Sequence, residues 1–132
     1  MAGETLFGDG FANVICAKEG DDTLWARGGA DQLFGDPGAD AMFGEAGADW
    51  IYGGLNYGGL GKDRERGGDG DDRLYGRGDG SKDCVWGDAG SNDWARLDIG
   101  LDNVNPPPAP WAAPPPWSDT VCGSSATIEA FD

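Results

Sequence analysis

Aspartate recurs at a regular spacing through most of this 132-residue chain. In ARGGADQLFGDPGADAMFGEAGADWIY, residues 26–52, each nonapeptide has Gly at its fourth place, Asp at its sixth and a large apolar residue at its eighth. Carboxylate and backbone carbonyl oxygens are the ligands that hard divalent cations prefer. The recurring Asp residues therefore predict a ladder of ligands for divalent cations.

Composition supports cation binding and argues against other functions. The chain has 24 acidic and 9 basic side chains, a formal charge of −15 and no His. This charge disfavours nucleic acid and anionic membrane surfaces as partners. Without His, the commonest general base is missing, and no nucleophile stands beside a recognisable base. We therefore expect no enzyme activity, and we expect the missing positive charge to come from bound ions.

The nonapeptide also predicts the elements that position the carboxylates. Its first six places are rich in Gly and Asp and should turn, whereas its last three alternate outward, inward and outward like a short strand. Two units make one coil, and stacked coils form parallel sheets, so this should be an all-β solenoid with the Asp residues of alternate repeats close together. The expected core is Leu6, Ile15, Leu24, Leu33, Met42, Ile51, Leu74, Val85 and Val104.

The units GGDGDDRLY, ARGGADQLF and GEAGADWIY resemble the RTX (repeats-in-toxin) nonapeptide, G-G-x-G-x-D-x-U-x, of hemolysin-type calcium-binding regions. The resemblance covers residues 8–105 with interruptions. It implies a right-handed parallel β-roll that folds on several Ca²⁺ ions in secreted or cell-surface bacterial proteins, often exported by type I secretion. Mapped by position, the resemblance implies backbone carbonyl ligands around Gly20, Gly29, Gly38, Gly47 and Gly70. It implies these side-chain ligands: Asp22, Asp31, Asp40, Asp49, Asp63, Asp72, Asp83 and Asp93.

Some repeats depart from this pattern. Ala17 and Ala26 replace the first Gly, which should distort their turns, and Asn13 should weaken the first site. Glu65 occupies an apolar place, so we expect the repeat at 58–66 to be bulged or exposed and Asp63 to be a doubtful ligand. The strongest sites should pair Asp22 with Asp40 and Asp31 with Asp49.

The chain divides by composition into four parts: a partial repeat at 1–7, the roll at 8–105 with an insertion near 53–57, a Pro-rich strap at 106–117, and a returning strand and cap at 118–132. No cleavable signal peptide or transmembrane stretch is visible. Because the chain begins within a repeat, we expect either an excised fragment or an export route that needs no N-terminal signal.

The ninth place of the repeat often holds an aromatic residue that should point outward, and the sequence allows more than one role for these side chains. They could stack on a glycan or a partner protein, or they could cover one another in a ladder: Trp25, Phe34, Phe43, Tyr52, Tyr75 and Trp86. One alternative function is therefore an adhesion or assembly module, which could also use the Pro-rich segment. Another is the calcium-responsive C-terminal part of a secreted hydrolase or toxin.

Two smaller features also stay open. Cys16 and Cys84 should lie too far apart to bridge, so Cys84 with Cys122 is the only pair we consider, beside the alternative that all three are small packed residues. The tripeptide Arg77-Gly78-Asp79 resembles an integrin-binding motif, but in a chain this rich in Gly and Asp we interpret it as a chance match.

Overall fold

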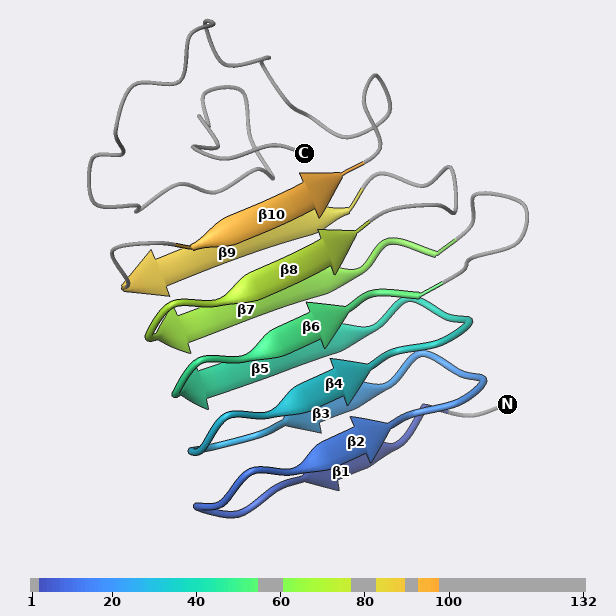
Figure 1. The fold of residues 1–132 in the computed structure, drawn as a ribbon. Coiled ribbons are helices and arrows are strands. Elements are labelled where there is room, and N and C mark those ends of the chain that lie inside the picture. Colours follow the sequence, from blue (N-terminus) through green and yellow to red (C-terminus); the bar gives the residue numbers. More distant parts are fainter. Residues whose placement is uncertain (1–2, 55–60, 77–82, 90–92, 98–132) are drawn as a thin grey trace, which may run out of the picture.

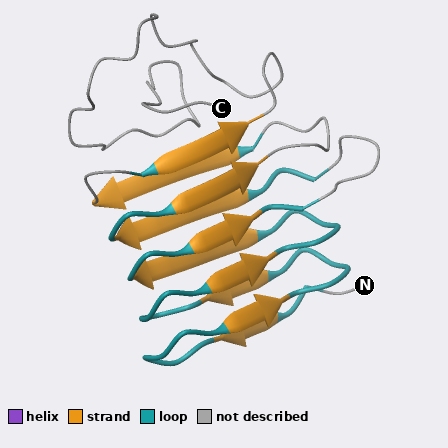
Figure 2. Cartoon of the chain, viewed as in Figure 1, coloured by secondary structure: helices purple, strands orange, loops and turns teal. Residues whose placement is uncertain are grey.

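The computed structural model describes residues 3–54, 61–76, 83–89 and 93–97, which form ten strands and no helix (Figures 1 and 2). Among these residues there is consequently no helix that could span a membrane. The strands are β1 (Thr5–Phe7), β2 (Val14–Cys16), β3 (Thr23–Trp25), β4 (Gln32–Phe34), β5 (Ala41–Ala46), β6 (Trp50–Tyr52), β7 (Arg64–Asp69), β8 (Arg73–Gly76), β9 (Cys84–Ala89) and β10 (Trp94–Leu97).

The strands form two parallel sheets that face each other. One sheet has the order β1-β3-β5-β7-β9 and the other β10-β8-β6-β4-β2. The chain alternates between the sheets, so each pair of consecutive strands makes one coil and the coils stack in chain order (Figure 1). This confirms the predicted all-β parallel solenoid of the β-roll type.

The second residue of each strand points into the space between the sheets. Leu24, Leu33, Met42 and Ile51 are fully buried, and Leu74 and Val85 nearly so, as the sequence predicts. In register they form two apolar ladders, since each lies beside the corresponding residue of the next coil. Leu6 and Ile15 are only partly buried because the first coil has a neighbour on one side alone. Val104 lies outside the described residues.

Glu65 does not behave as its charge suggested. The expectation that its repeat is bulged or exposed is wrong, because Glu65 is fully buried in strand β7. It takes its place in the ladder between Met42 and Val85, and β7 pairs in register with β5 on one side and β9 on the other. A slip by one residue would turn every side chain of β7 to the opposite face. The two flanking strands therefore hold Glu65 inside.

The turns share one backbone conformation despite their different sequences. In the described turns after the first one, the second residue has a positive φ, with Lys18 at 83°, Arg27 at 76° and Glu45 at 72°. Lys18 and Arg27 directly follow Ala17 and Ala26, whose amides donate to Phe34 and Phe43 at 2.9 Å in the regular pattern. The expected distortion of these two turns is therefore not found.

The insertion begins later than the repeat frame suggests. Gly53 donates to the carbonyl of Tyr75, and Gly54 has the positive φ of a second-place residue, at 122°. These two residues therefore occupy the first two places of a regular turn. The sheet register advances from Met42 to Glu65, 23 positions, whereas it advances from Leu24 to Met42 by 18. The extra residues consequently fall after Gly54 rather than at 53–57.

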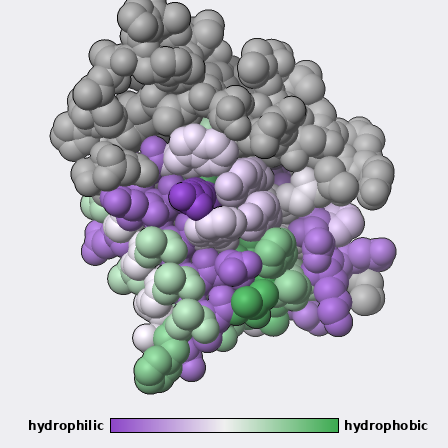
Figure 3. Space-filling model, in the orientation of Figure 1, coloured by the Kyte–Doolittle hydropathy of each residue, from purple (hydrophilic) through white to green (hydrophobic). Residues whose placement is uncertain are grey.

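The outward aromatic residues stack along both sheets. Trp25 lies on Phe43 with ring centroids 4.0 Å apart, and Phe34, Tyr52 and Tyr75 follow one another at 4.8 and 4.5 Å. The rings within each stack are nearly parallel, so they cover one another as a ladder. Figure 3 shows green hydrophobic surface gathered low on this view, over the first coils, with purple hydrophilic surface toward the turns.

Candidate metal centre

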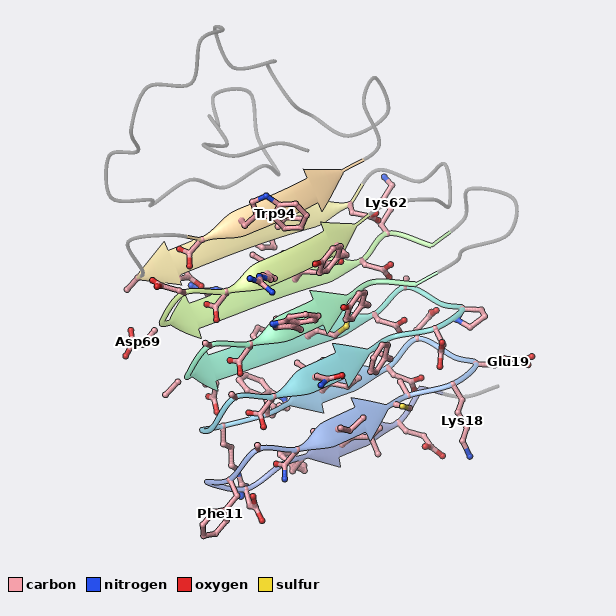
Figure 4. All side chains as sticks on the ribbon, viewed as in Figure 1. Phe11, Lys18, Glu19, Lys62, Asp69 and Trp94 are labelled. Atoms are coloured by element: carbon pink, nitrogen blue, oxygen red, sulfur yellow. The ribbon has the colours of Figure 1, made fainter. Side chains whose placement is uncertain are left out.

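The eight predicted aspartates lie in two columns, one along each turn edge of the roll. The turns that lead from the even-numbered to the odd-numbered strands hold Asp22, Asp40, Asp63 and Asp83; the opposite turns hold Asp31, Asp49, Asp72 and Asp93, with Asn13 first. Figure 4 marks the first edge by Lys18, Glu19 and Lys62 and the second by Phe11 and Asp69. All eight Asp residues are buried, none exposing more than 6% of its surface.

Each buried Asp is bound to the coil before it through one carboxylate oxygen. The backbone N–H of Asp22 donates to Oδ1 of Asp40 at 2.8 Å, and that of Asp31 donates to Oδ1 of Asp49 at 2.8 Å. The structure thus brings together both of the pairs singled out from the sequence. The same bond continues across the insertion, where the N–H of Asp40 donates to Oδ1 of Asp63 at 2.9 Å. Asp63 therefore belongs to its column like its neighbours.

The second carboxylate oxygen, Oδ2, does not take part in this regular bond between coils. Oδ2 is buried without a hydrogen-bond partner in six of these residues: Asp22, Asp31, Asp40, Asp49, Asp72 and Asp93. In Asp40, Asp49, Asp72 and Asp93 it lies against the first Gly of its own turn, so that a Cβ added at Gly35 would stand 2.5 Å from Oδ2 of Asp40. Burying a carboxylate oxygen without a partner is costly. These six atoms are the strongest indication in the structure that a cation belongs here.

Burial also shifts the acidity of these groups. Loss of solvent raises the pKa of Asp40 and Asp72 to about 7 and that of Asp49 to about 6, against 3.8 for an ordinary Asp. The donated backbone N–H opposes each shift, while neighbouring carboxylates such as Asp63 beside Asp40 add to it. The pKa of Asp31 and Asp93 is raised for the same main reason. At neutral pH the columns thus strongly favour a positive partner.

Glycine at the fourth place brings backbone carbonyls close to the columns. A Cβ at Gly38 would overlap the carbonyl oxygen of Gly20, and one at Gly47 would overlap that of Gly29. Gly20, Gly29, Gly47 and Gly70 also have φ between 120° and 141°, a region that other residues rarely adopt. Sequence reasoning named these Gly residues for their carbonyls, but it missed that the first-place Gly residues make room for Oδ2. Their recurrence in the motif was the signal.

The available ligands fit a hard cation held jointly by side chains and backbone. Among the described residues, no three His, Cys, Asp or Glu side chains converge by themselves into a metal site. An ion between coils would therefore combine Asp oxygens from adjoining coils with Gly carbonyls of the same edge. All of these ligands are oxygens, as Ca²⁺ prefers, and their flexible number suits its coordination of six to eight.

Several sequence predictions concern other parts of the chain. Cys16 is a free, exposed thiol. The pairing of Cys84 with Cys122 involves a residue outside the described part, and so do the Arg77-Gly78-Asp79 motif and the segments at 106–117 and 118–132.

Comparison with known proteins agrees with this geometry. Neither the curated proteins nor the solved structures gave a match. A family model, the RTX calcium-binding nonapeptide repeat in four copies, matches residues 7–42, 34–56 and 57–93. These ranges cover more than half of the chain and contain every described turn between two strands. The chain therefore belongs to the RTX calcium-binding nonapeptide repeat family, and its stacked coils form a calcium-binding β-roll.

Proposed function

We propose that this roll folds when it binds several Ca²⁺ ions in an extracellular setting and has no catalytic activity of its own. The observation that carries the proposal is the set of six buried Oδ2 atoms without a partner. Burial leaves these carboxylates costly when charged, whereas a cation shared between coils would neutralise them. Because the columns exist only in the stacked coils, the free energy of ion binding would stabilise the folded state directly.

The proposed ligands follow from the two columns. On one edge they are the carboxylates of Asp22, Asp40, Asp63 and Asp83 with carbonyls around Gly20 and Gly38; on the other they are those of Asp31, Asp49, Asp72 and Asp93 with carbonyls around Gly29, Gly47 and Gly70. Bound Ca²⁺ would supply positive charge and fix the distance between successive turns. Asn13 brings no charge and should leave the end of its column weaker.

The extracellular setting is proposed from calcium supply and from the family. Extracellular calcium modules commonly bind in the range of about 10⁻⁴–10⁻³ M. A chain of charge −15 that stays unfolded at low calcium could leave the cell by type I secretion and fold outside. RTX repeats occur in secreted bacterial proteins, which supports this order of events.

Circular dichroism during a calcium titration tests the proposal. The full chain in chelator should show little strand signal, gain it cooperatively as Ca²⁺ is added, and lose it again when chelator is restored. Mg²⁺ at the same concentration should be much less effective because it demands octahedral geometry and retains its waters. Strand signal that is equally strong in chelator and in calcium would contradict the proposal.

A second role, assembly with another protein, is favoured by the first coil. Phe7, Phe11 and Val14 expose 61%, 77% and 67% of their surface there, and β1 and β2 each form the open edge of a sheet. Such apolar edges invite pairing with another chain. Light scattering of the calcium-loaded protein and of a Phe11→Ser, Val14→Thr variant would test this role. Identical monomers would argue against it and leave open the role of a calcium-responsive part of a secreted hydrolase or toxin.

A further inference from the structure

The aromatic ladder on the β1-β3-β5-β7-β9 sheet has one interruption. Phe7, Trp25 and Phe43 occupy equivalent outward positions on β1, β3 and β5, and Trp86 does so on β9. Arg66 holds the equivalent position on β7, directly beside Phe43 in register. A row of aromatic residues on three strands is therefore followed by a cationic side chain.

The guanidinium of Arg66 is held by a carboxylate of the next coil. Its Nε donates to Oδ2 of Asp88 at 2.8 Å and its second terminal nitrogen to Oδ1 at 2.9 Å, a two-bond pairing that fixes the guanidinium. Phe43, by contrast, lies flat on Trp25 on its other side. Phe43 and Arg66 both line an open space on the outer side of this sheet.

This space is a cavity of about 470 Å³, a usual size for a ligand pocket. Trp25 and Phe43 supply its apolar wall, and the Gly67–Gly68 backbone lines it as well. Glu45, Asp69 and Asp88 bring three carboxylates and Arg66 one positive charge. Since Arg66 and Asp88 neutralise each other, Glu45 and Asp69 leave the cavity with a net negative charge. Figure 4 shows Asp69 at the turn edge, pointing away from the ribbon.

We propose that this cavity, the Phe43–Asp69 pocket, binds an arginine side chain of a protein partner. A guanidinium stacks on an aromatic face and can pair with carboxylates at its rim. The roll already makes the stacking contact twice with its own residues, Arg27 lying over Phe7 at 5.4 Å and Arg73 over Trp50 at 4.7 Å. A chain of charge −15 would also attract a basic segment over long range.

The pocket is separate from the calcium columns. Its carboxylates are the exposed Glu45 and Asp69 and the half-buried Asp88, none of which belongs to the buried sixth-place set. The inference needs only the folded roll, so it does not depend on calcium being the trigger for folding. Loss of the pocket and loss of calcium-driven folding are therefore distinguishable by measuring peptide binding and strand signal on the same sample.

The test is a titration of the full calcium-saturated chain with an acetylated Ala-Arg-Ala amide, followed by NMR. The matched probe is the same peptide with citrulline, which keeps the planar group but lacks the charge. We expect the Arg peptide to bind with shifts at Phe43, Glu45 and Asp69. The citrulline peptide should bind about tenfold more weakly or not at all, because its ureido group cannot form charge-assisted bonds.

Variants locate the site. Glu45 and Asp69 form the acidic rim of the pocket, and Glu45→Gln and Asp69→Asn should each weaken binding of the Arg peptide by about tenfold. Phe43→Leu should also weaken binding, although it leaves both rim carboxylates in place. Glu19→Gln, an equal charge change on an exposed turn of the other edge, should leave binding unchanged. All variants are compared at equal calcium-induced strand signal. Equal affinity for the Arg and citrulline peptides, no effect of the rim variants, or binding of a neutral hexose in place of the Arg peptide would each overturn the proposal.

Discussion

Asp49→Asn separates the two tasks of a buried column carboxylate. Asp49 is fully buried, and its Oδ1 accepts the N–H of Asp31 while Oδ2 has no partner. Asn keeps an oxygen for the bond from Asp31 but replaces the other with an amide nitrogen. Oδ2 of Asp49 and the carbonyl oxygen of Gly67 both border the point where a Cβ on Gly44 would stand, so this carbonyl is a candidate acceptor for the new nitrogen. The variant therefore removes charge and a cation ligand with little change of shape.

We expect the sign of its effect to depend on calcium. Burial raises the pKa of Asp49 from 3.8 to about 6, which corresponds to a penalty of about 3 kcal/mol for the ionised group in the calcium-free fold. In chelator at pH 7.5, Asp49→Asn should thus show more strand signal and a higher thermal midpoint than the wild type. With Ca²⁺ the order should reverse, the calcium midpoint rising by about tenfold or more because a charged ligand is lost.

Asp21→Asn is the matched control. Asp21 is exposed in a turn, and its Oδ1 accepts the N–H of Ala39 at 2.9 Å, which Asn can continue to do. It changes the net charge equally but should leave both midpoints nearly unchanged. If Asp49→Asn lowers stability in chelator as well, or leaves the calcium midpoint as it was, then the carboxylate is not held for a cation and our reasoning fails.

Three further predictions concern the calcium-free fold and the core. In chelator, the raised pKa of Asp40 and Asp72 means that their protonated forms favour the fold; stability should therefore increase as pH falls from about 7 toward 4, and a flat profile in circular dichroism would contradict this. Gly47→Ala should raise the calcium midpoint strongly because the φ of 140° at this residue disfavours a side chain and its Cβ would overlap the carbonyl oxygen of Gly29, whereas Gly10→Ala, with open space around it, should not. Glu65→Leu should continue the apolar ladder and stabilise the calcium-free fold by about 1–4 kcal/mol in thermal melts; a lower melting temperature would show that the carboxylate is needed there.

Much of the fold could be predicted because the repeat specifies it locally. The apolar eighth place alternates with outward-facing neighbours, so the pattern predicts Leu24 and Met42 in the core without reference to their partners. The Asp residues at the sixth place follow as one set. Pairing in register then brought Asp22 beside Asp40 and Asp31 beside Asp49. These contacts arise from equal spacing along the chain, which a single sequence displays directly.

The remaining features depend on neighbours that the local pattern does not contain. Glu65 looks like a surface residue by itself, and only the strands on both sides keep it buried. The start of the insertion depends on Gly53 and Gly54 continuing the turn geometry of the coil before. The opening beside Phe43 requires Arg66 to reach Asp88, 22 positions away. Each is a property of stacking between coils, which sequence spacing alone could not predict.

The stacking of coils one upon the next has a mechanical consequence. Because each strand is bonded only to strands of adjacent coils, a molecule held by its two ends should give way one coil at a time rather than all at once. A coil of 18 residues, as between Leu24 and Met42, would release about 60 Å of chain, and the 23 residues between Met42 and Glu65 about 75 Å. Under an optical trap the insertion would appear as the longest step in the extension record, and added calcium would raise the force at which the steps occur.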